Sequence, residues 1–388
     1  MVRGGLLVPK PGFWTAASGP QQILLRSRCV SSPDSHREPG QPPPDQKGVS
    51  PFDHPDSFHS ASQQNPMTEI RQAKPLAVPE SEALRYLPEG PIPLGDGLIS
   101  WVGIQHGSDS TIGSLNVLDL RAGVNQSFDL PGRPGFAFPC EHEHTFVVGC
   151  ERSLGYYDVS SGLWRTFCEG IDEGVENTII NDGMVFEDNL IFGTKDLEFS
   201  TKKAGLYLYR GSDRKLIRLR DDQICSNGKA MLRDPDGTLQ LLDIDSPTRQ
   251  VVRYEFDIEG GRLGPPQVVL DLAGDPAVPD GAILTPDGRG MIVSMFHVDP
   301  ADHGETRLYD LSSGELRCVW QTPLSPQNTC PALVRLGGEL KLVITTAVEH
   351  MDSEARKKCT AAGRIFLADV DLEDTGTALT PLYPLIVG

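Results

Sequence analysis

One phrase recurs along the chain from about residue 80 onward: an apolar strand that ends in a polar residue and leads into a polar turn. Successive occurrences are roughly 40 to 55 residues apart, which suits one four-stranded propeller blade per repeat. Apolar and polar residues alternate with period two, with almost no helical period. The repeat therefore predicts an all-β chain, a six-bladed β-propeller with four-stranded blades around a central channel. The six occurrences begin at Leu115, Tyr156, Leu206, Tyr254, Leu308 and Ile365.

The region before the repeats has a different composition. Residues 1–78 are rich in Pro, Ser, Gln and Gly and cannot bury enough apolar surface to order themselves. We therefore expect a disordered leader at 1–78 and the propeller at 79–388. The first 33 residues hold four basic residues and no acidic one, the composition of an organelle transit peptide. Two other interpretations stay open: Met67 is the true start, or the leader is an inert tail.

The overall charge limits the class of partner. The formal net charge is -18 at pH 7. Proteins that bind nucleic acids or anionic lipids gain affinity from clustered Lys and Arg, which an acidic surface opposes. No apolar stretch approaches the roughly 20 residues needed to cross a bilayer. We therefore expect no nucleic-acid partner and no membrane partner.

The eight cysteines are scattered, without a CxxC pair or a regular spacing. This pattern disfavours a zinc cluster and a disulfide scaffold. Free Cys behaves as a small buried hydrophobe, so the cysteines fit a reducing compartment. The expected location is cytoplasmic, with an organelle possible through the transit peptide.

Three short motifs place oxygen-bearing side chains in expected tight turns, each before an apolar strand: Asn181-Asp182-Gly183, Ser226-Asn227-Gly228 and Pro279-Asp280-Gly281. Locally these are ordinary turn sequences. They recur at the blade spacing, however, and precede the strand expected to be innermost, so their side chains could converge on the axis. With Glu89, which opens the first blade, they form a set of hard oxygen ligands. Such ligands suit Ca²⁺, Mg²⁺ or Mn²⁺, although Zn²⁺ also accepts carboxylates.

The order and spacing of these motifs resemble those of the family of regucalcin (senescence marker protein), gluconolactonase and luciferin-regenerating enzyme. The resemblance extends from about Glu89 to Phe366 and implies a six-bladed propeller. Each motif alone is weak, and the ordered set is specific. The motifs are Glu89-Gly90-Pro91 with Trp101-Val102, Asn181-Asp182-Gly183 with Gly193-Thr194, Ser226-Asn227-Gly228 with Asp245-Ser246, Val278-Pro279-Asp280-Gly281, and Val343-Ile344-Thr345-Thr346-Ala347 with Ala362-Gly363-Arg364-Ile365-Phe366.

In that family one divalent cation is held by residues that match Glu89, Asn227 and Asp280 here. Asn181 matches a further Asn that contacts substrate or a metal-bound water. The resemblance thus implies a metal-dependent lactonase acting on a small lactone. The cation (Ca²⁺, Zn²⁺, Mg²⁺ or Mn²⁺) would polarise the lactone carbonyl, and Asp280 would accept a proton from the attacking water.

The chain departs from the family where substrate binds. Sugar lactonases of the family often carry Arg two residues before the first Asn, where this chain has Ile179, and this puts aldonolactone binding in doubt. Lys195 aligns with a position near the same cavity wall, and we expect it to bind substrate; the alternative is a solvated surface lysine. Glu198 aligns with an acid found near the cavity in some members, and it could contact substrate or pair with Lys195.

Two other functions stay open. One is hydrolysis of another small ester, because a water activated on a cation is not selective for rings. The other is a non-catalytic propeller that binds metal and ligand. His297 and His350 each end a strand at an expected channel mouth and are candidates for its rim. We expect a monomer or a small homo-oligomer.

Overall fold

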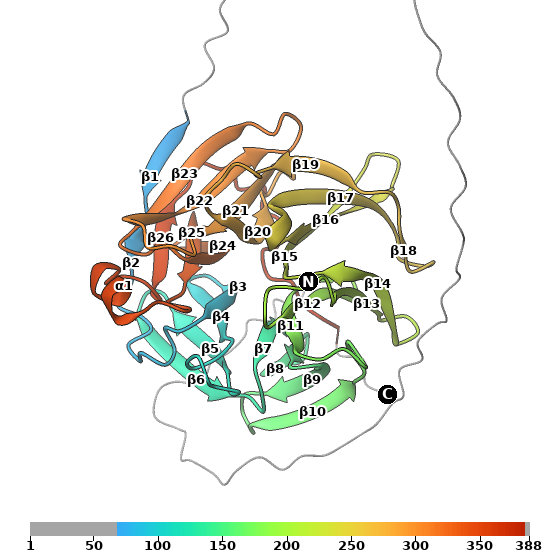
Figure 1. The fold of residues 1–388 in the computed structure, drawn as a ribbon. Helices are drawn as coiled ribbons and strands as arrows, with labels where there is room; N and C mark the ends of the chain where they lie inside the picture. The colour runs from blue at the N-terminus through green and yellow to red at the C-terminus, as the bar shows by residue number, and fades with distance from the viewer. Residues whose placement is uncertain (1–67, 385–388) are drawn as a thin grey trace, which may run out of the picture.

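Six antiparallel sheets stand around a common axis like the blades of a propeller (Figure 1). The structure, a computed structural model, describes residues 68–384. The first strand of each blade contacts the first strand of the next, all the way around the ring, so these six strands are innermost. The expectation of an all-β, six-bladed propeller with four-stranded blades is confirmed.

Within each blade the strands follow the chain from the axis outward. Blades 1 to 3 contain β3 (Pro88–Gly95), β4 (Leu98–Gly103), β5 (Ser114–Asp119) and β6 (Val124–Asp129); β7 (Pro134–Pro139), β8 (Thr145–Cys150), β9 (Ser153–Asp158) and β10 (Leu163–Cys168); and β11 (Thr178–Phe186), β12 (Asn189–Asp196), β13 (Ala204–Arg210) and β14 (Lys215–Gln223).

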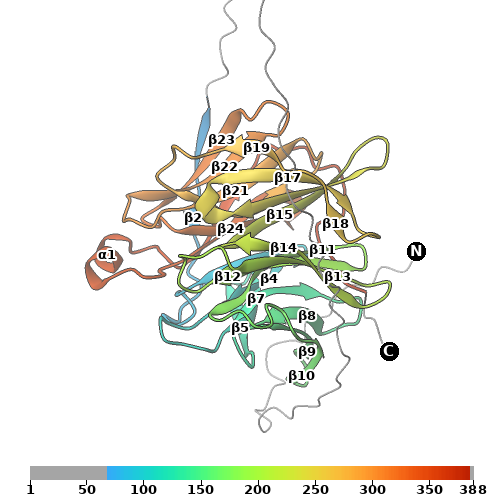
Figure 2. The same ribbon diagram turned by 45° about the vertical axis from the view of Figure 1, so that its right-hand side comes forward.

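Blades 4 to 6 continue the same order, with the outermost strand of blade 4 divided into two short segments. These blades contain β15 (Ser226–Arg233), β16 (Leu239–Asp245), β17 (Gln250–Asp257), β18 (Arg262–Leu263) and β19 (Gln267–Asp271); β20 (Val278–Leu284), β21 (Gly290–Phe296), β22 (His303–Asp310) and β23 (Leu316–Pro323); and β24 (Asn328–Leu336), β25 (Glu339–Thr346) and β26 (Ile365–Asp369). The helix α1 (Ser353–Lys358) lies between β25 and β26 and stands off the ring (Figure 2).

The recurring phrase in the sequence corresponds to one structural position. Its six occurrences fall in β5, β9, β13, β17, β22 and β26, each the third strand of its blade. A third strand has a neighbour on both sides, and the faces of adjacent blades cover it, which explains its run of apolar residues. The described cysteines agree with the expectation of free thiols: none of the seven is in a disulfide, and six are buried.

The core consists of apolar layers between adjacent blades. Trp101 of β4 is fully buried and packs with Val334, Val343 and Ile365 of blade 6. Between blades 2 and 3, the rings of Phe136 and Phe192 lie 5.9 Å apart, centroid to centroid. Each such aromatic contributes about 1.5–3 kcal/mol through burial. These layers hold the blades at fixed angles and so position the axis.

The ring is closed by the start of the described chain. β2 (Lys74–Pro75) pairs with β26 as the outer strand of blade 6, and β1 (Glu69–Gln72) pairs in parallel with β23 of blade 5 (Figure 1). The boundary expected at residue 79 thus differs from the structure, because residues 69–75 supply edge strands to two blades. These two strands were not predicted because the segment is poor in apolar residues. An edge strand can form largely through backbone hydrogen bonds and so needs few apolar side chains. The rest of the expected leader, 1–67, lies outside the described residues.

All six innermost strands contain an irregularity where they pair with the second strand of their blade. In β11, β15 and β20 the register shifts beside Asn181, Asn227 and Asp280, and in β3 it shifts after Glu89. The expected tight turns before the strands are therefore bulges within them. Turns and bulges both favour Asn, Asp and Gly, and a bulge re-aims its side chain, here toward the axis.

The glycines of these bulges permit the inner strands to approach closely. A Cβ added at Gly281 would lie 2.6 Å from the Cys330 sulfur and 2.9 Å from the Cys330 Cα on β24. A Cβ at Gly228 would lie 2.8 Å from the carbonyl oxygen of Asp280. The ring thus has no room for a side chain at these positions.

Gly281→Ala is therefore expected to lower the free energy of unfolding by about 1–3 kcal/mol, because backbone of β24 must move. Gly274→Ala is the matched control, since a Cβ at Gly274 meets no atom within 4 Å. Denaturant unfolding at equilibrium measures both. Equal stability of the two variants would contradict this account of inner-strand packing.

Candidate functional site

A cavity of about 60 Å³ opens at the end of the axis where the innermost strands begin. Its lining includes Glu89 of β3, Asn181 of β11, Asn227 of β15 and Asp280 of β20, together with Lys195 of β12. The four oxygen-bearing residues whose motifs recur at the blade spacing therefore come from four different blades. All five side chains belong to the set expected from the sequence.

A hydrogen-bonded network fixes the two amides. The Asn181 side-chain nitrogen donates to Asn227 Oδ1 at 2.8 Å and to the Ser226 carbonyl oxygen at 2.9 Å. The Asn227 nitrogen donates to Ser246 Oγ at 2.8 Å. These bonds orient Asn227 Oδ1 toward Asn181. They also leave Asn181 Oδ1 without a donor among the described residues, so it is available to a ligand.

Asp245 supports this network from outside the cavity. Its Oδ1 accepts hydrogen bonds from the backbone N–H groups of Ile224 at 3.1 Å and Cys225 at 2.8 Å. The segment that leads into Asn227 is thereby held in place, and the neighbouring Ser246 is the acceptor for the Asn227 amide. The Asp245-Ser246 pair noted in the sequence thus has a positioning role.

Three carboxyl groups line the cavity, Glu89, Asp280 and Glu349, and nearby negative charges oppose the ionisation of Glu89 and Asp280. Burial raises the pKa of Glu89, and the negative charge of Asp182 adds to the increase. Burial also raises the pKa of Asp280 well above its ordinary value, with further contributions from the charges of Glu89 and Asp182. The positive charge of Lys195 acts in the opposite direction on both. Ionised together, these groups need a cation.

Lys195 is a buried cation. Its exposed fraction is only 3%, and its ammonium lies 5.7 Å from the ring centroid of Phe199, which also lines the cavity. Within residues 68–384 no carboxylate lies within ion-pair distance of it. A buried ammonium without an ionic partner is costly. Lys195 is thus not a solvated surface lysine, and its charge faces the cavity.

The donor set fits a hard divalent cation. Asp280 is a buried carboxylate and Glu89 a half-buried one, and neither forms an ion pair within the described part of the chain. Asn227 and Asn181 add amide oxygens, which Ca²⁺, Mg²⁺ and Mn²⁺ accept. In residues 68–384 no group of three or more His, Cys, Asp or Glu side chains could hold a metal ion. A site here would therefore depend on the amides as much as on the carboxylates.

Other residues expected at the site lie elsewhere. Glu198 is outside the cavity lining, and it pairs with Lys203 at 3.2 Å and accepts a hydrogen bond from Asn177 at 3.0 Å. Its contact with substrate stays a prediction. Ile179 is 1% exposed and packs in the core with Leu87 and Ile104.

The cavity also contains residues that the sequence did not single out. Phe296 and Glu349 line it, each directly before a histidine considered for the rim, His297 or His350. The Glu349 side chain is 12% exposed and that of His350 is 72% exposed. The residue that lines the cavity is thus one position before the histidine expected there. The sequence alone does not show which residue at a strand end faces the axis. The remaining residues of the lining are Leu87, Ile104, Phe199, Cys225, Ser246 and Val278.

These features define the class of protein: a six-bladed propeller with an acidic cavity on its axis, built from bulges of the innermost strands. A sequence profile of the family described as SMP-30/Gluconolactonase/LRE-like region matches residues 87–348. The chain belongs to this family. The match contains Glu89, Asn181, Asn227 and Asp280.

Relatives with known names support the same assignment. A Bacillus subtilis (strain 168) protein named "Putative sugar lactone lactonase YvrE" is 29% identical over 188 residues, which are 46% of this chain and 57% of that protein. Regucalcin from Danio rerio is 26% identical over 235 residues, 57% of this chain and 75% of that protein. The chain thus spans little more than half the length of the Bacillus relative.

The fold has a solved counterpart. The crystal structure of a calcium-binding protein, regucalcin, from Agrobacterium tumefaciens str. C58 superposes with a TM-score of 0.68 at 22% identity, covering 82% of this chain and 100% of that chain. This likeness shows the shared propeller. Within residues 68–384 no helix is long and apolar enough to span a bilayer.

A pH-dependent stability effect follows from the buried carboxyls. A carboxyl with a pKa raised by folding keeps its proton where the unfolded chain has released it, so stability falls as pH rises toward the folded pKa. In a chelator, Asp280→Asn should therefore raise the free energy of unfolding. The gain should grow between pH 5 and pH 8, to on the order of 1–3 kcal/mol.

Denaturant unfolding at several pH values measures this gain, and added Ca²⁺ or Mn²⁺ should reverse its sign. Asp236→Asn is the control, because Asp236 lies in a second Pro-Asp-Gly tripeptide that is exposed in a hairpin turn. A gain for Asp280→Asn that does not change with pH would count against opposed charges in the cavity.

Proposed function

We propose that this protein is a divalent-metal-dependent hydrolase that opens a small lactone. One observation carries the proposal: the carboxylates of Glu89 and Asp280 and two amides, from four blades, converge in one cavity of a chain that belongs to the SMP-30/Gluconolactonase/LRE-like family. The name of the Bacillus relative supports the lactone substrate class. The small volume of the cavity supports a small substrate.

In the proposed site, Glu89, Asn227 and Asp280 would hold the cation, which would supply Lewis acidity toward the lactone carbonyl. Asp280 would accept a proton from the water that attacks this carbonyl. In the absence of a cation, burial raises the Asp280 pKa, and a bound cation would counteract this increase and keep the carboxylate ionised. Asn181, with its nitrogen committed to Asn227 and Ser226, offers its oxygen to a substrate hydroxyl or to water.

Lys195 is proposed to take over part of substrate binding. Ile179 is packed in the core, so the position of the family's usual Arg contributes no charge to the cavity. Lys195 brings a positive charge to the cavity from the neighbouring strand β12. Glu198, more exposed and bound to Lys203, would contact only a substrate that extends to the rim. This arrangement favours a lactone with an electron-rich or anionic substituent.

Metal dependence is tested with the full chain, stripped of metal and then given Ca²⁺, Mg²⁺, Mn²⁺ or Zn²⁺, in a pH-stat assay on sugar and aliphatic lactones. Turnover should return with metal, and Asp280→Asn should lower kcat at least 100-fold, because the proton acceptor is lost. Asp236→Asn should keep full activity. Tight metal binding without turnover of any lactone would overturn the lactonase proposal in favour of a binding propeller or another ester.

The Lys195 proposal is tested by Lys195→Met, with Lys202→Met as the control, because Lys202 is exposed in the loop that follows β12. On the lactone that is turned over, Lys195→Met should raise KM by about tenfold with a smaller change in kcat, because a charged hydrogen bond of about 1.5–3 kcal/mol is lost. Lys202→Met should leave both constants unchanged. An unchanged KM for Lys195→Met would remove Lys195 from substrate binding.

A further inference from the structure

A second, larger cavity lies at the opposite end of the axis. Its volume is about 350 Å³, within the lower range of sites that bind small molecules. All six innermost strands line it, each with residues that follow its bulge. In β11, for example, Asn181 lines the first cavity, and Asp182 through Val185 line the second. The two cavities share no lining residue.

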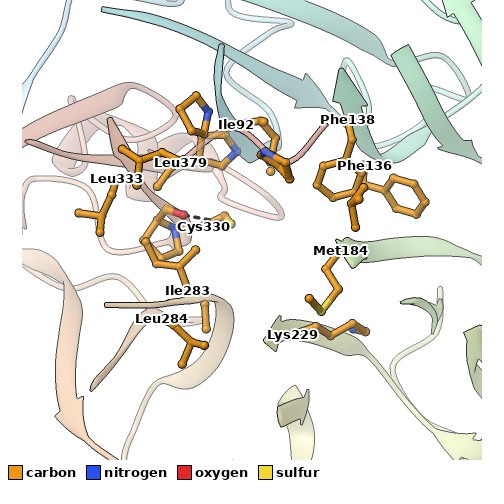
Figure 3. A pocket seen from close by; sticks show the side chains of 18 of the residues that line it. Ile92, Phe136, Phe138, Met184, Lys229, Ile283, Leu284, Cys330, Leu333 and Leu379 are labelled. Atoms are coloured by element: carbon orange, nitrogen blue, oxygen red, sulfur yellow. Dashed lines mark hydrogen bonds between the residues drawn. The ribbon is translucent and has the colours of Figure 1, made fainter. Parts of the chain in front are cut away.

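The walls of this second cavity are apolar. Phe136, Phe138 and Met184 line it from blades 2 and 3 (Figure 3). Ile283 and Leu333 face them from blades 5 and 6 (Figure 3). A space of this kind favours an aliphatic ligand, because water gains few hydrogen bonds from such walls.

The C-terminal segment of the described chain completes the wall. Residues 377–379 and Pro381 line the cavity as this segment crosses the face of the propeller. On one side the Asp374 carboxylate binds Arg335 of β24 at 2.6 Å. On the other side the Tyr383 N–H donates to the carbonyl oxygen of Pro139 at 2.9 Å, and Tyr383 is fully buried. The segment is thus anchored at both ends, and the cavity is preformed.

One charged group is available inside this cavity. Asp182 is half-buried, and its Oδ1 accepts a hydrogen bond from the N–H of Gly183 at 2.7 Å. In residues 68–384 it has no ion-pair partner within 4 Å. Burial raises the pKa of Asp182, while the positive charge of Lys229 and the hydrogen bond from Gly183 act in the opposite direction.

The lysine in the same lining does not neutralise it directly. The Lys229 side chain is fully buried, its ammonium donates to the Asn227 carbonyl oxygen at 2.7 Å, and it lies 3.5 Å from the Asp243 carboxylate. Its charge is therefore already paired. Lys229 contributes its aliphatic stem to the wall (Figure 3).

We propose that this second cavity is a binding site for an aliphatic amine. The apolar walls would enclose the hydrocarbon chain, and the ammonium group would pair with the Asp182 carboxylate in water-poor surroundings. Such a pair is strong because both apolar burial and charge neutralisation contribute. The site is separate from the proposed lactonase site and does not depend on that function.

Isothermal titration of the full chain with n-octylamine, 1-octanol and octanoate at pH 7 tests the proposal. Octylamine should bind with one site per chain, octanol at least tenfold more weakly, and octanoate not measurably, because only the ammonium complements Asp182. Octanoate binding as tightly as octylamine would overturn the proposal. So would multiple weak sites for octylamine, which indicate adsorption to the acidic surface, or the absence of binding by all three probes.

Two variants locate the site. Asp182→Asn should reduce the affinity for octylamine to that for octanol, while Asp236→Asn should not change it. Met184→Trp should fill the cavity and abolish binding of both probes, while Val268→Trp, at a position 52% exposed on an outer strand, should not. Circular dichroism checks that each variant folds. If octylamine still binds to Met184→Trp, the ligand lies elsewhere and the proposal is wrong. If a variant does not fold, the comparison of octylamine, octanol and octanoate on the unmodified chain tests the proposal.

Discussion

The close approach of six strands at the axis is the constraint on which the rest of this structure depends. Side chains cannot fit between neighbouring inner strands at Gly228 and Gly281, so glycine is required there and the strand buckles into a bulge. The residue before each glycine is thereby aimed at the axis. The same tripeptides consequently determine how the inner strands pack and which side chains face the axial cavity. A substitution that changes the strand packing therefore also moves the side chains of the cavity.

The axial cavity stores unfavourable electrostatic energy. Burial and nearby negative charges raise the pKa values of Glu89 and Asp280, and the positive charge of Lys195 offsets only part of this increase. Layers of buried aromatic and branched residues between the blades stabilise the fold enough to offset this unfavourable electrostatic energy. Such a balance is typical of functional sites, where groups are held in positions that folding alone would not select.

Much of the fold was readable from the sequence, because third strands are apolar on both faces and recur once per blade. The residues Glu89, Asn181, Asn227 and Asp280 could also be found, since their motifs share the blade spacing. Bulges were expected as turns because Asn-Gly and Asp-Gly serve both. The strands at residues 69–75 and Glu349 were missed, since edge pairing and strand-end register leave no periodic pattern in the sequence.

The closure of the ring by β2 and β26 has a consequence for synthesis of the protein. The two partners stand near opposite ends of the described chain, so blade 6 cannot form until nearly all of it has left the ribosome. Until then the inner faces of blades 1 and 5 lack their neighbour and expose apolar layers. Contacts between such distant segments form slowly. The emerging propeller is therefore an open arc with exposed apolar faces until this last blade closes the ring.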